Sequence, residues 1–230
     1  QIAAAQDGAD LQVDASASLG TINPYVYGSN MNLYSIIPQS LMDEAQAMGI
    51  RFMRFGGGDT DRMDMRSSII DLFILQMRQL GAEPLMSVRL LGGTPEAAAE
   101  WVRYANIEKD YDIHYWTIGN EPNLFVALMG AETYTVDDLS TQWRAIAEAM
   151  LEVDPTIEFV GPDITQYIPL TVAGDNITFD TRSGAPFDAE GNDWLIPFLQ
   201  ANGDLLAFVG LHRYPWPGEG GGSGATIEGM

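Results

Sequence analysis

One short stretch of the sequence places an amide, a carboxylate and a proline at the end of an apolar run. Tyr115–Gly119 is predicted to be a strand, and Asn120, Glu121 and Pro122 follow it directly. A carboxyl group at the mouth of a buried strand is rigidly held and partly desolvated, and desolvation raises its pKa toward neutral pH. Such a group suits general acid catalysis, and the adjacent amide can hydrogen-bond a substrate hydroxyl. We therefore expect a catalytic Glu121, the alternative being a solvated Glu at a strand end.

Further polar side chains follow the other predicted strands. In barrels of parallel strands, functional groups gather at the C-terminal strand ends. These ends carry Asn30, Arg54, Arg89, Asn120, Glu121, Asp163, His212 and Tyr214. For Arg54, a ligand contact and an internal salt bridge are equally good interpretations. His212 and Tyr214 either line the same pocket or pack in the core, and Trp216 either stacks on a ligand ring or fills a loop.

The elements that must position these residues alternate regularly along the chain. Strands are predicted at residues 25–32, 51–55, 83–91, 115–119, 158–161 and 207–211, with amphipathic helices between them. One of those helices is predicted to bury Trp143, Ile146, Ala147 and Met150. Uninterrupted strand–helix alternation with apolar strands predicts a parallel sheet covered by helices. We therefore expect an α/β fold, a (β/α)8 TIM barrel with about six of its eight units present.

The same pattern divides the chain into three parts. Residues 23–217 are predicted to form the partial barrel. Residues 1–22 are expected to be an N-terminal segment that pairs with a missing β-domain. Residues 218–230 are glycine-rich and end like the start of another helix. We expect a chain cut about two units short of a closed barrel, which usually needs about 250 residues.

Composition restricts the partners of the protein. The 230 residues contain 32 acids against 11 Lys and Arg, a formal net charge of −21, so nucleic acid and anionic membranes are repelled. No apolar run is long enough to span a bilayer. Cys is absent, which excludes disulfides and zinc-thiolate sites. Gly56–Gly58 lacks the partners of a nucleotide site, so no cofactor is expected. With no leader before Gln1, we expect a secreted, extracellular protein whose signal peptide was removed, or a piece of a longer chain.

Two smaller motifs have less specific interpretations. Asp59, Asp61 and Asp64 follow the triple glycine, and their oxygens could bind a hard cation. Their spacing does not match a complete calcium loop, so a solvated acidic turn is the preferred interpretation and no metal is expected. Asn176 begins a glycosylation sequon, which matters only in a eukaryotic secretory host.

Together, these pieces resemble the clan-A retaining glycoside hydrolases, closest to arabinofuranosidase, xylosidase and endoglucanase-like families with (β/α)8 barrels. The matching pieces occur in the right order between about residues 20 and 217: Ile22–Gly28, Arg51–Gly57, Gly92–Ala98, Tyr115–Pro122 and His212–Pro215. The set is specific, whereas Asn-Glu-Pro alone is not.

The resemblance implies roles for individual residues. Glu121 would be the general acid/base, and Asn120 would hydrogen-bond the 2-hydroxyl of the bound sugar. The sugar subsite would be lined by Arg54, His212 and Tyr214, and we add Asn30 and Trp216 as substrate-binding candidates. The nucleophile of the family is a Glu at the end of strand seven, which we expect beyond residue 230, so the 230-residue chain alone is expected to be inactive. Glu219 and Glu228 are in the wrong place to replace it.

The function expected from the resemblance is hydrolysis of a polysaccharide or oligosaccharide by a retaining double displacement. That mechanism needs two carboxyl groups about 5–5.5 Å apart, of which the sequence identifies one. The alternative is a non-catalytic carbohydrate-binding or structural extracellular protein that reuses the barrel. In either case, the missing C-terminal part or a neighbouring chain is expected to cover the open barrel edge, since an unpaired edge favours aggregation.

Overall fold

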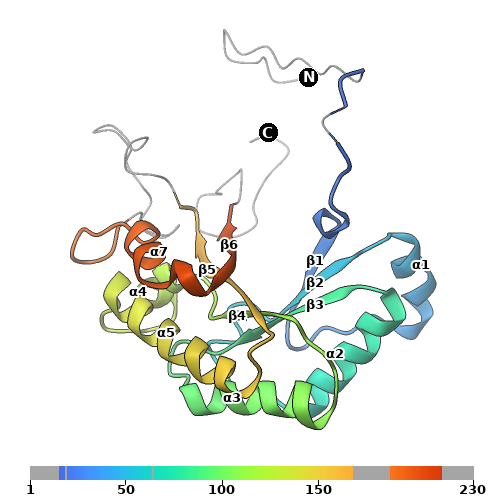
Figure 1. The fold of residues 1–230 in the computed structure, drawn as a ribbon, viewed down its shortest axis with the longest axis horizontal. Coiled ribbons are helices and arrows are strands. Elements are labelled where there is room, and N and C mark those ends of the chain that lie inside the picture. Colours follow the sequence, from blue (N-terminus) through green and yellow to red (C-terminus); the bar gives the residue numbers. More distant parts are fainter. Residues whose placement is uncertain (1–15, 19, 64, 168–186, 214–230) are drawn as a thin grey trace.

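Six parallel strands form a curled half-barrel with helices along its outer side (Figure 1). The structure is a computed structural model that describes residues 16–18, 20–63, 65–167 and 187–213. The strands pair in chain order: β1 (Gly28–Met31), β2 (Phe52–Phe55), β3 (Glu83–Val88), β4 (Tyr115–Ile118), β5 (Glu158–Thr165) and β6 (Leu206–His212). The expected α/β fold, a partial TIM barrel, is confirmed. The proposed roles of residues 1–22 and 218–230 stay predictions, because residues 1–15, 19 and 218–230 lie outside the described residues.

Helices connect successive strands. The longer ones are α1 (Met42–Ala47), α2 (Ser67–Leu80), α3 (Pro95–Val102), α5 (Val136–Val153) and α7 (Ile196–Asn202). Short elements are η1 (Pro24–Val26), η2 (Gln39–Leu41), the π-helical η3 (Arg103–Glu108), η4 (Pro122–Leu124), α4 (Phe125–Leu128) and η6 (Gly203–Leu205). Among the described residues, none of the helices has the length and apolar character needed to cross a bilayer.

Strand boundaries differ from the sequence-based prediction by three or more residues in three places, one of which is the end of β3 at Val88 instead of residue 91. The first strand begins three residues late, because Asn23 caps a 3-10 turn and Pro24 occupies its first position. The fifth strand continues past Gly161 to Thr165, although Pro162 has no N–H to give. It remains paired with β6 through a register shift between Pro162 and Ile164. This extension brings Asp163 and Thr165 to the end of the sheet.

Aromatic side chains fill the space between the sheet and α5. Trp116 and Phe159 project from β4 and β5, and both are buried. The ring of Trp143 on α5 lies 5.4 Å from that of Phe159 and 5.3 Å from that of Phe198. The buried stripe predicted for α5 is present, so the helix packs against the sheet through its apolar face.

The concave side of the sheet changes from aromatic to polar along the strands. Near the strand starts, the ring of Tyr115 on β4 packs against Phe52 on β2 at 5.5 Å and Phe208 on β6 at 5.9 Å. Successive side chains of a strand alternate between its two faces, so the residues two positions further on share this side. Those residues are Arg54 on β2, Thr117 on β4 and Gly210 on β6. The two-residue alternation along the strands therefore places polar side chains next to a layer of aromatic rings, on the side nearer the C-terminal strand ends.

The capping hydrogen bonds at the N-terminus of α5 can be tested by substitution. Thr135 and Asp138 form a reciprocal capping box there. We expect Thr135→Ala to lower the free energy of unfolding by about 1 kcal/mol, because a backbone N–H loses its acceptor. Thr141→Ala, at an exposed position inside the same helix, should be neutral or slightly stabilising, since Ala is the better helix former. Urea denaturation of the two variants measures the difference, and equal losses would contradict the cap.

The edges of the described sheet are β1 and β6. On β6, Phe208 is 53% exposed and Val209 51% exposed. Exposed apolar edges template association between chains, and an edge Lys opposes it. We expect the 230-residue protein to associate at micromolar concentration and Val209→Lys to reduce this in analytical ultracentrifugation. Val126→Lys adds the same charge at a similarly exposed site on α4, away from the edge, and should leave association unchanged.

Candidate active site

Glu121 is positioned by a tight turn after β4. Gly119 and Glu121 both have left-handed backbone conformations, with φ of 79° and 51°. A Cβ at position 119 would lie 2.7 Å from the Cβ of Leu90, so the close approach of the β3 end requires glycine. The Glu121 N–H donates to the carbonyl oxygen of Asp163 at 3.1 Å. The turn is therefore fixed to the ends of both neighbouring strands.

A second anchor follows immediately in η4. The side-chain amide of Asn123 donates to the carbonyl oxygen of Thr165 at 2.9 Å and accepts from the Thr165 N–H at 3.1 Å. All of these groups are buried. The pair of hydrogen bonds ties η4 to the end of β5, so Glu121 lies between two attachments to that strand.

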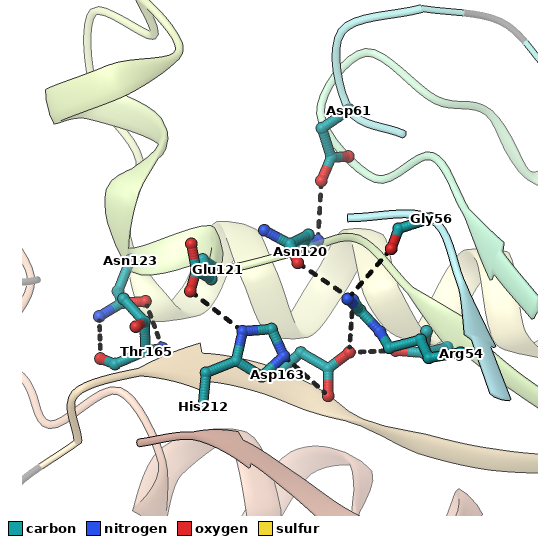
Figure 2. Close-up of polar contacts among 10 residues, drawn as sticks. Arg54, Gly56, Asp61, Asn120, Glu121, Asn123, Asp163, Thr165 and His212 are labelled. Carbon is teal, nitrogen blue, oxygen red and sulfur yellow. Dashed lines mark hydrogen bonds and ion pairs between the residues drawn. The ribbon is translucent and has the colours of Figure 1, made fainter. Parts of the chain in front are cut away.

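Arg54 connects three strands at the centre of the site (Figure 2). Its Nη2 lies 3.0 Å from Asp163 Oδ2 and 3.1 Å from Asn120 Oδ1. Thr117 Oγ1 donates to the same Asp163 oxygen at 2.8 Å. The Arg54 and Asp163 side chains are only 14% and 5% exposed, so this is a buried ion pair whose desolvation is offset by several hydrogen bonds. Of the two interpretations of Arg54, the internal salt bridge is present, and it lies beside Asn120.

His212 reaches Glu121 from the end of β6. His212 Nδ1 and Glu121 Oε1 are 3.0 Å apart, and His212 Nε2 lies 3.9 Å from Asp163 Oδ1. Burial alone would raise the pKa of Glu121. The hydrogen bond and charge of His212, with smaller contributions from Thr165 and Arg54, outweigh burial and hold that pKa below its ordinary value.

The expectation of a raised Glu121 pKa is therefore wrong. The side chain is still 19% exposed, so its desolvation is incomplete, and a nearby imidazole and guanidinium stabilise the carboxylate. Both of these groups are distant from Glu121 in the sequence.

Asp61 has a different role from either one predicted for the acidic turn. It is only 2% exposed, so it is not part of a solvated turn. Its Oδ1 accepts the N–H groups of Leu90 and Leu91 at 2.8 and 2.9 Å, and its Oδ2 accepts that of Asn120 at 2.8 Å. Burial raises the pKa of Asp61 to about 6 despite these three hydrogen bonds and the charge of Arg89. Asp61 thus joins the segments that follow β3 and β4.

The described residues contain no group of three or more His, Cys, Asp or Glu side chains arranged to bind a metal ion. Asp59 is engaged by the Leu33 N–H, which donates to its Oδ2 at 2.8 Å. Asp64 lies outside the described residues.

Four of the sequence-predicted site residues come together: Arg54, Asn120, Glu121 and His212. Asn30 does not join them. With its amide nitrogen as the donor, it hydrogen-bonds the carbonyl oxygens of Gly56 at 3.1 Å and Arg54 at 3.3 Å, alongside β2. Tyr214 and Trp216 lie outside the described residues, so their placement stays a prediction.

Asp163 was predicted only as a polar strand end, and Asp61 only as part of the acidic turn. The network also contains Thr117, Asn123 and Thr165, which had no predicted role. One signal was available in the sequence for Thr117, since alternation puts it on the same side of β4 as Tyr115. The others depend on contacts between distant segments, which no local pattern reveals.

Solved structures with a similar fold are glycoside hydrolases. A bifunctional glucanase-xylanase from a metagenome library has a TM-score of 0.65 and 16% identity, over 87% of this chain and 56% of that one. A family 51 α-L-arabinofuranosidase from Bifidobacterium longum has a TM-score of 0.63 and 17% identity, over 88% and 47%. A family 44 endoglucanase from Clostridium thermocellum has a TM-score of 0.55 and 17% identity, over 84% and 52%.

These similarities define the class of fold. The chain spans about half the length of the three structures, and at such low identity the likeness shows the fold alone. No protein-family model and no curated protein matches the sequence. The protein thus has the partial TIM-barrel fold shared with family 51 arabinofuranosidases and family 44 glucanases, as the sequence resemblance predicts.

The contacts of Asp61 predict a stability effect. In Asp61→Asn, the amide keeps one acceptor oxygen and turns its NH2 toward a backbone N–H. At pH 7 we expect the free energy of unfolding to fall by about 1–3 kcal/mol, the cost of a buried donor without an acceptor. Asp43→Asn, at an exposed position on α1, should change it by less than about 0.5 kcal/mol.

Asp61 should also produce a specific pH dependence. Its folded-state pKa of about 6 is above the ordinary value of 3.8, so protonation of Asp61 favours the folded state. This stabilisation is complete below the unfolded-state pKa and is lost as the pH rises through about 6. The stability advantage of wild type over Asp61→Asn should therefore grow as the pH falls from 7 to 5. A difference that shrinks over this range in urea titrations would show that the pKa of Asp61 is not raised.

Proposed function

We propose that this protein is a glycoside hydrolase that acts on a polysaccharide or oligosaccharide, with Glu121 as the general acid/base of a retaining double displacement. The observation that supports this proposal is the meeting of Arg54, Asn120, Glu121 and His212 in one hydrogen-bonded network. They come from the C-terminal ends of β2, β4 and β6, the end of a parallel barrel at which active sites lie.

Asn120 is suited to bind a sugar hydroxyl beside Glu121. Its Oδ1 accepts from Arg54, which fixes the orientation of the amide. The Nδ2 group has no hydrogen-bond partner among the described residues, so it can donate to a ligand. Because the Asn120 N–H is held by Asp61, the residue is fixed at both its backbone and its side chain.

Glu121 would transfer a proton in each half of the reaction. In the first step it gives a proton to the leaving-group oxygen, and in the second it removes one from the attacking water. The lowered pKa of Glu121 favours the carboxylate formed in the first step and the base needed in the second, and it disfavours the protonated form that begins the first step.

The second carboxylate of the mechanism is the nucleophile, which the resemblance assigns to a seventh strand. The described part of the chain has six strands. Asp163 is not suited to this role, because Arg54 and Thr117 both bind its Oδ2 and it is 4% exposed.

The substrate class follows from the chemistry of the similar structures. Their activities are those of a glucanase-xylanase, an arabinofuranosidase and an endoglucanase, so β-glucan, xylan and arabinan are the first substrates to test. Such polymers lie outside cells, and we accordingly propose a secreted protein. Its acidic surface does not oppose binding of a neutral glycan.

The central test is Glu121→Gln in a protein extended through the expected seventh strand. The substitution removes the transferable proton and keeps the shape of the side chain. We expect hydrolysis of an unactivated glycan to fall by about 10²–10⁴-fold, the usual contribution of general acid catalysis. An aryl glycoside with a good leaving group needs no proton in the first step, so its cleavage should fall less. Reducing-sugar release and chromophore release measure the two reactions.

Glu132→Gln is the matched control, because Glu132 is exposed and lies outside the network. It should retain wild-type turnover. Unchanged turnover in Glu121→Gln would eliminate Glu121 as the acid/base. Glycan binding in calorimetry without any hydrolysis by a protein extended through the expected seventh strand would instead favour the non-catalytic carbohydrate-binding alternative.

A further inference from the structure

The His212 imidazole lies between two carboxylates. Nδ1 is 3.0 Å from Glu121 Oε1, and Nε2 faces Asp163 Oδ1 at 3.9 Å (Figure 2). The His212 side chain is 21% exposed, and those of Glu121 and Asp163 are 19% and 5% exposed. Interactions between these charges are therefore only weakly screened by water.

The hydrogen bonds of Asp163 leave one of its oxygens for His212. The Arg54 guanidinium and the Thr117 hydroxyl both donate to Oδ2, so this oxygen acts as an acceptor. Oδ1 lies against β6 at Gly210, where an added Cβ would be 2.2 Å from it. The absence of a side chain at position 210 thus makes room for Asp163 Oδ1 beside His212.

This arrangement distinguishes the two tautomers of neutral His212. A proton on Nδ1 alone would turn the lone pair of Nε2 toward the Asp163 carboxylate, which is repulsive. A proton on Nε2 faces Asp163 favourably and leaves the Nδ1 lone pair toward Glu121. The 3.0 Å contact with Glu121 then requires one more proton between the two groups.

We propose that Asp163 is a positioning residue that keeps His212 protonated on Nε2 and thereby retains a proton between His212 Nδ1 and Glu121 Oε1. The proton is carried either as an imidazolium beside a carboxylate or as a carboxylic acid beside a neutral imidazole. In both forms the proton count is the same, and it is the proton that Glu121 gives to the leaving group. The catalytic meaning rests on the proposed function, whereas the protonation pattern does not.

Two other groups face this arrangement. Arg54 on β2 pairs with Asp163 through Oδ2, which leaves Oδ1 toward His212, while the positive charge of Arg54 opposes the additional proton. Thr165 on β5 contributes a hydroxyl to Glu121. Neither group accepts the Nε2 proton in place of Asp163.

Nitrogen-15 NMR of the 230-residue protein tests the inference directly. The chain has two histidines, and His114→Gln removes the signals of the other one. Near neutral pH, we expect the Nε2 nitrogen of His212 to resonate in the protonated range. In Asp163→Asn, the amide can present its NH2 to Nε2, so the Nε2 proton should be lost and Nδ1–H should donate to Glu121.

Thr117→Val is the matched control, because it removes a hydrogen bond from Asp163 Oδ2 and keeps the carboxylate charge. It should leave Nε2 protonated. The inference is overturned if Asp163→Asn keeps the wild-type pattern, or if Thr117→Val loses the Nε2 proton as fully as Asp163→Asn does. If Asp163→Asn does not fold, the wild-type spectrum decides: a neutral His212 protonated on Nδ1 alone contradicts the proposal.

The outcome is separable from that of the proposed function. If the tautomers are as expected but a protein extended through the seventh strand hydrolyses no glycan, the result counts against the hydrolase assignment alone. An active enzyme whose Asp163→Asn variant retains the wild-type spectrum counts against the role of Asp163 alone.

Discussion

The buried ion pair between Arg54 and Asp163 is the interaction on which the rest of the site depends. β2 and β5 are not neighbours in the sheet, so the pair crosses the concave side of the half-barrel. From this pair, contacts extend to Asn120 on one side and to His212 on the other. Removing one member of such a pair leaves an uncompensated buried charge, which typically costs about 3–5 kcal/mol. The positions of Asn120 and His212 around Glu121 therefore depend on the curvature of the sheet, which brings Arg54 and Asp163 into contact.

Two carboxyl groups of the site show how environment sets acidity. Asp61 is buried with few charges nearby, and its pKa rises. Glu121 is partly exposed beside an imidazole and a guanidinium, and its pKa falls. A raised pKa alone would select Asp61 as the acid, but its oxygens bind three backbone N–H groups. Asp61 organises the loops, while the Glu121 side chain remains partly exposed.

Local periodicity was sufficient to predict the strand–helix alternation, the apolar stripe of α5 and the polar strand ends that include Arg54 and His212. It failed where burial depends on distant segments. Asp61 lies in a sequence of glycines and acids that resembles a solvated turn, and it is buried only because the segments after β3 and β4 close over it. Likewise, the direction of the Glu121 pKa shift depends on His212, which lies 91 residues further along the chain.

The left-handed backbone of Glu121 has a consequence for the evolution of this site. The left-handed conformation destabilises a non-glycine residue such as Glu121 by roughly 1–2 kcal/mol, whereas glycine adopts it without this penalty. Replacement of Glu121 by glycine would relieve the backbone while deleting the carboxylate. Selection for stability and selection for the carboxylate thus act in opposite directions at this position. A related barrel in which this side chain had no role would be expected to drift toward glycine at this position.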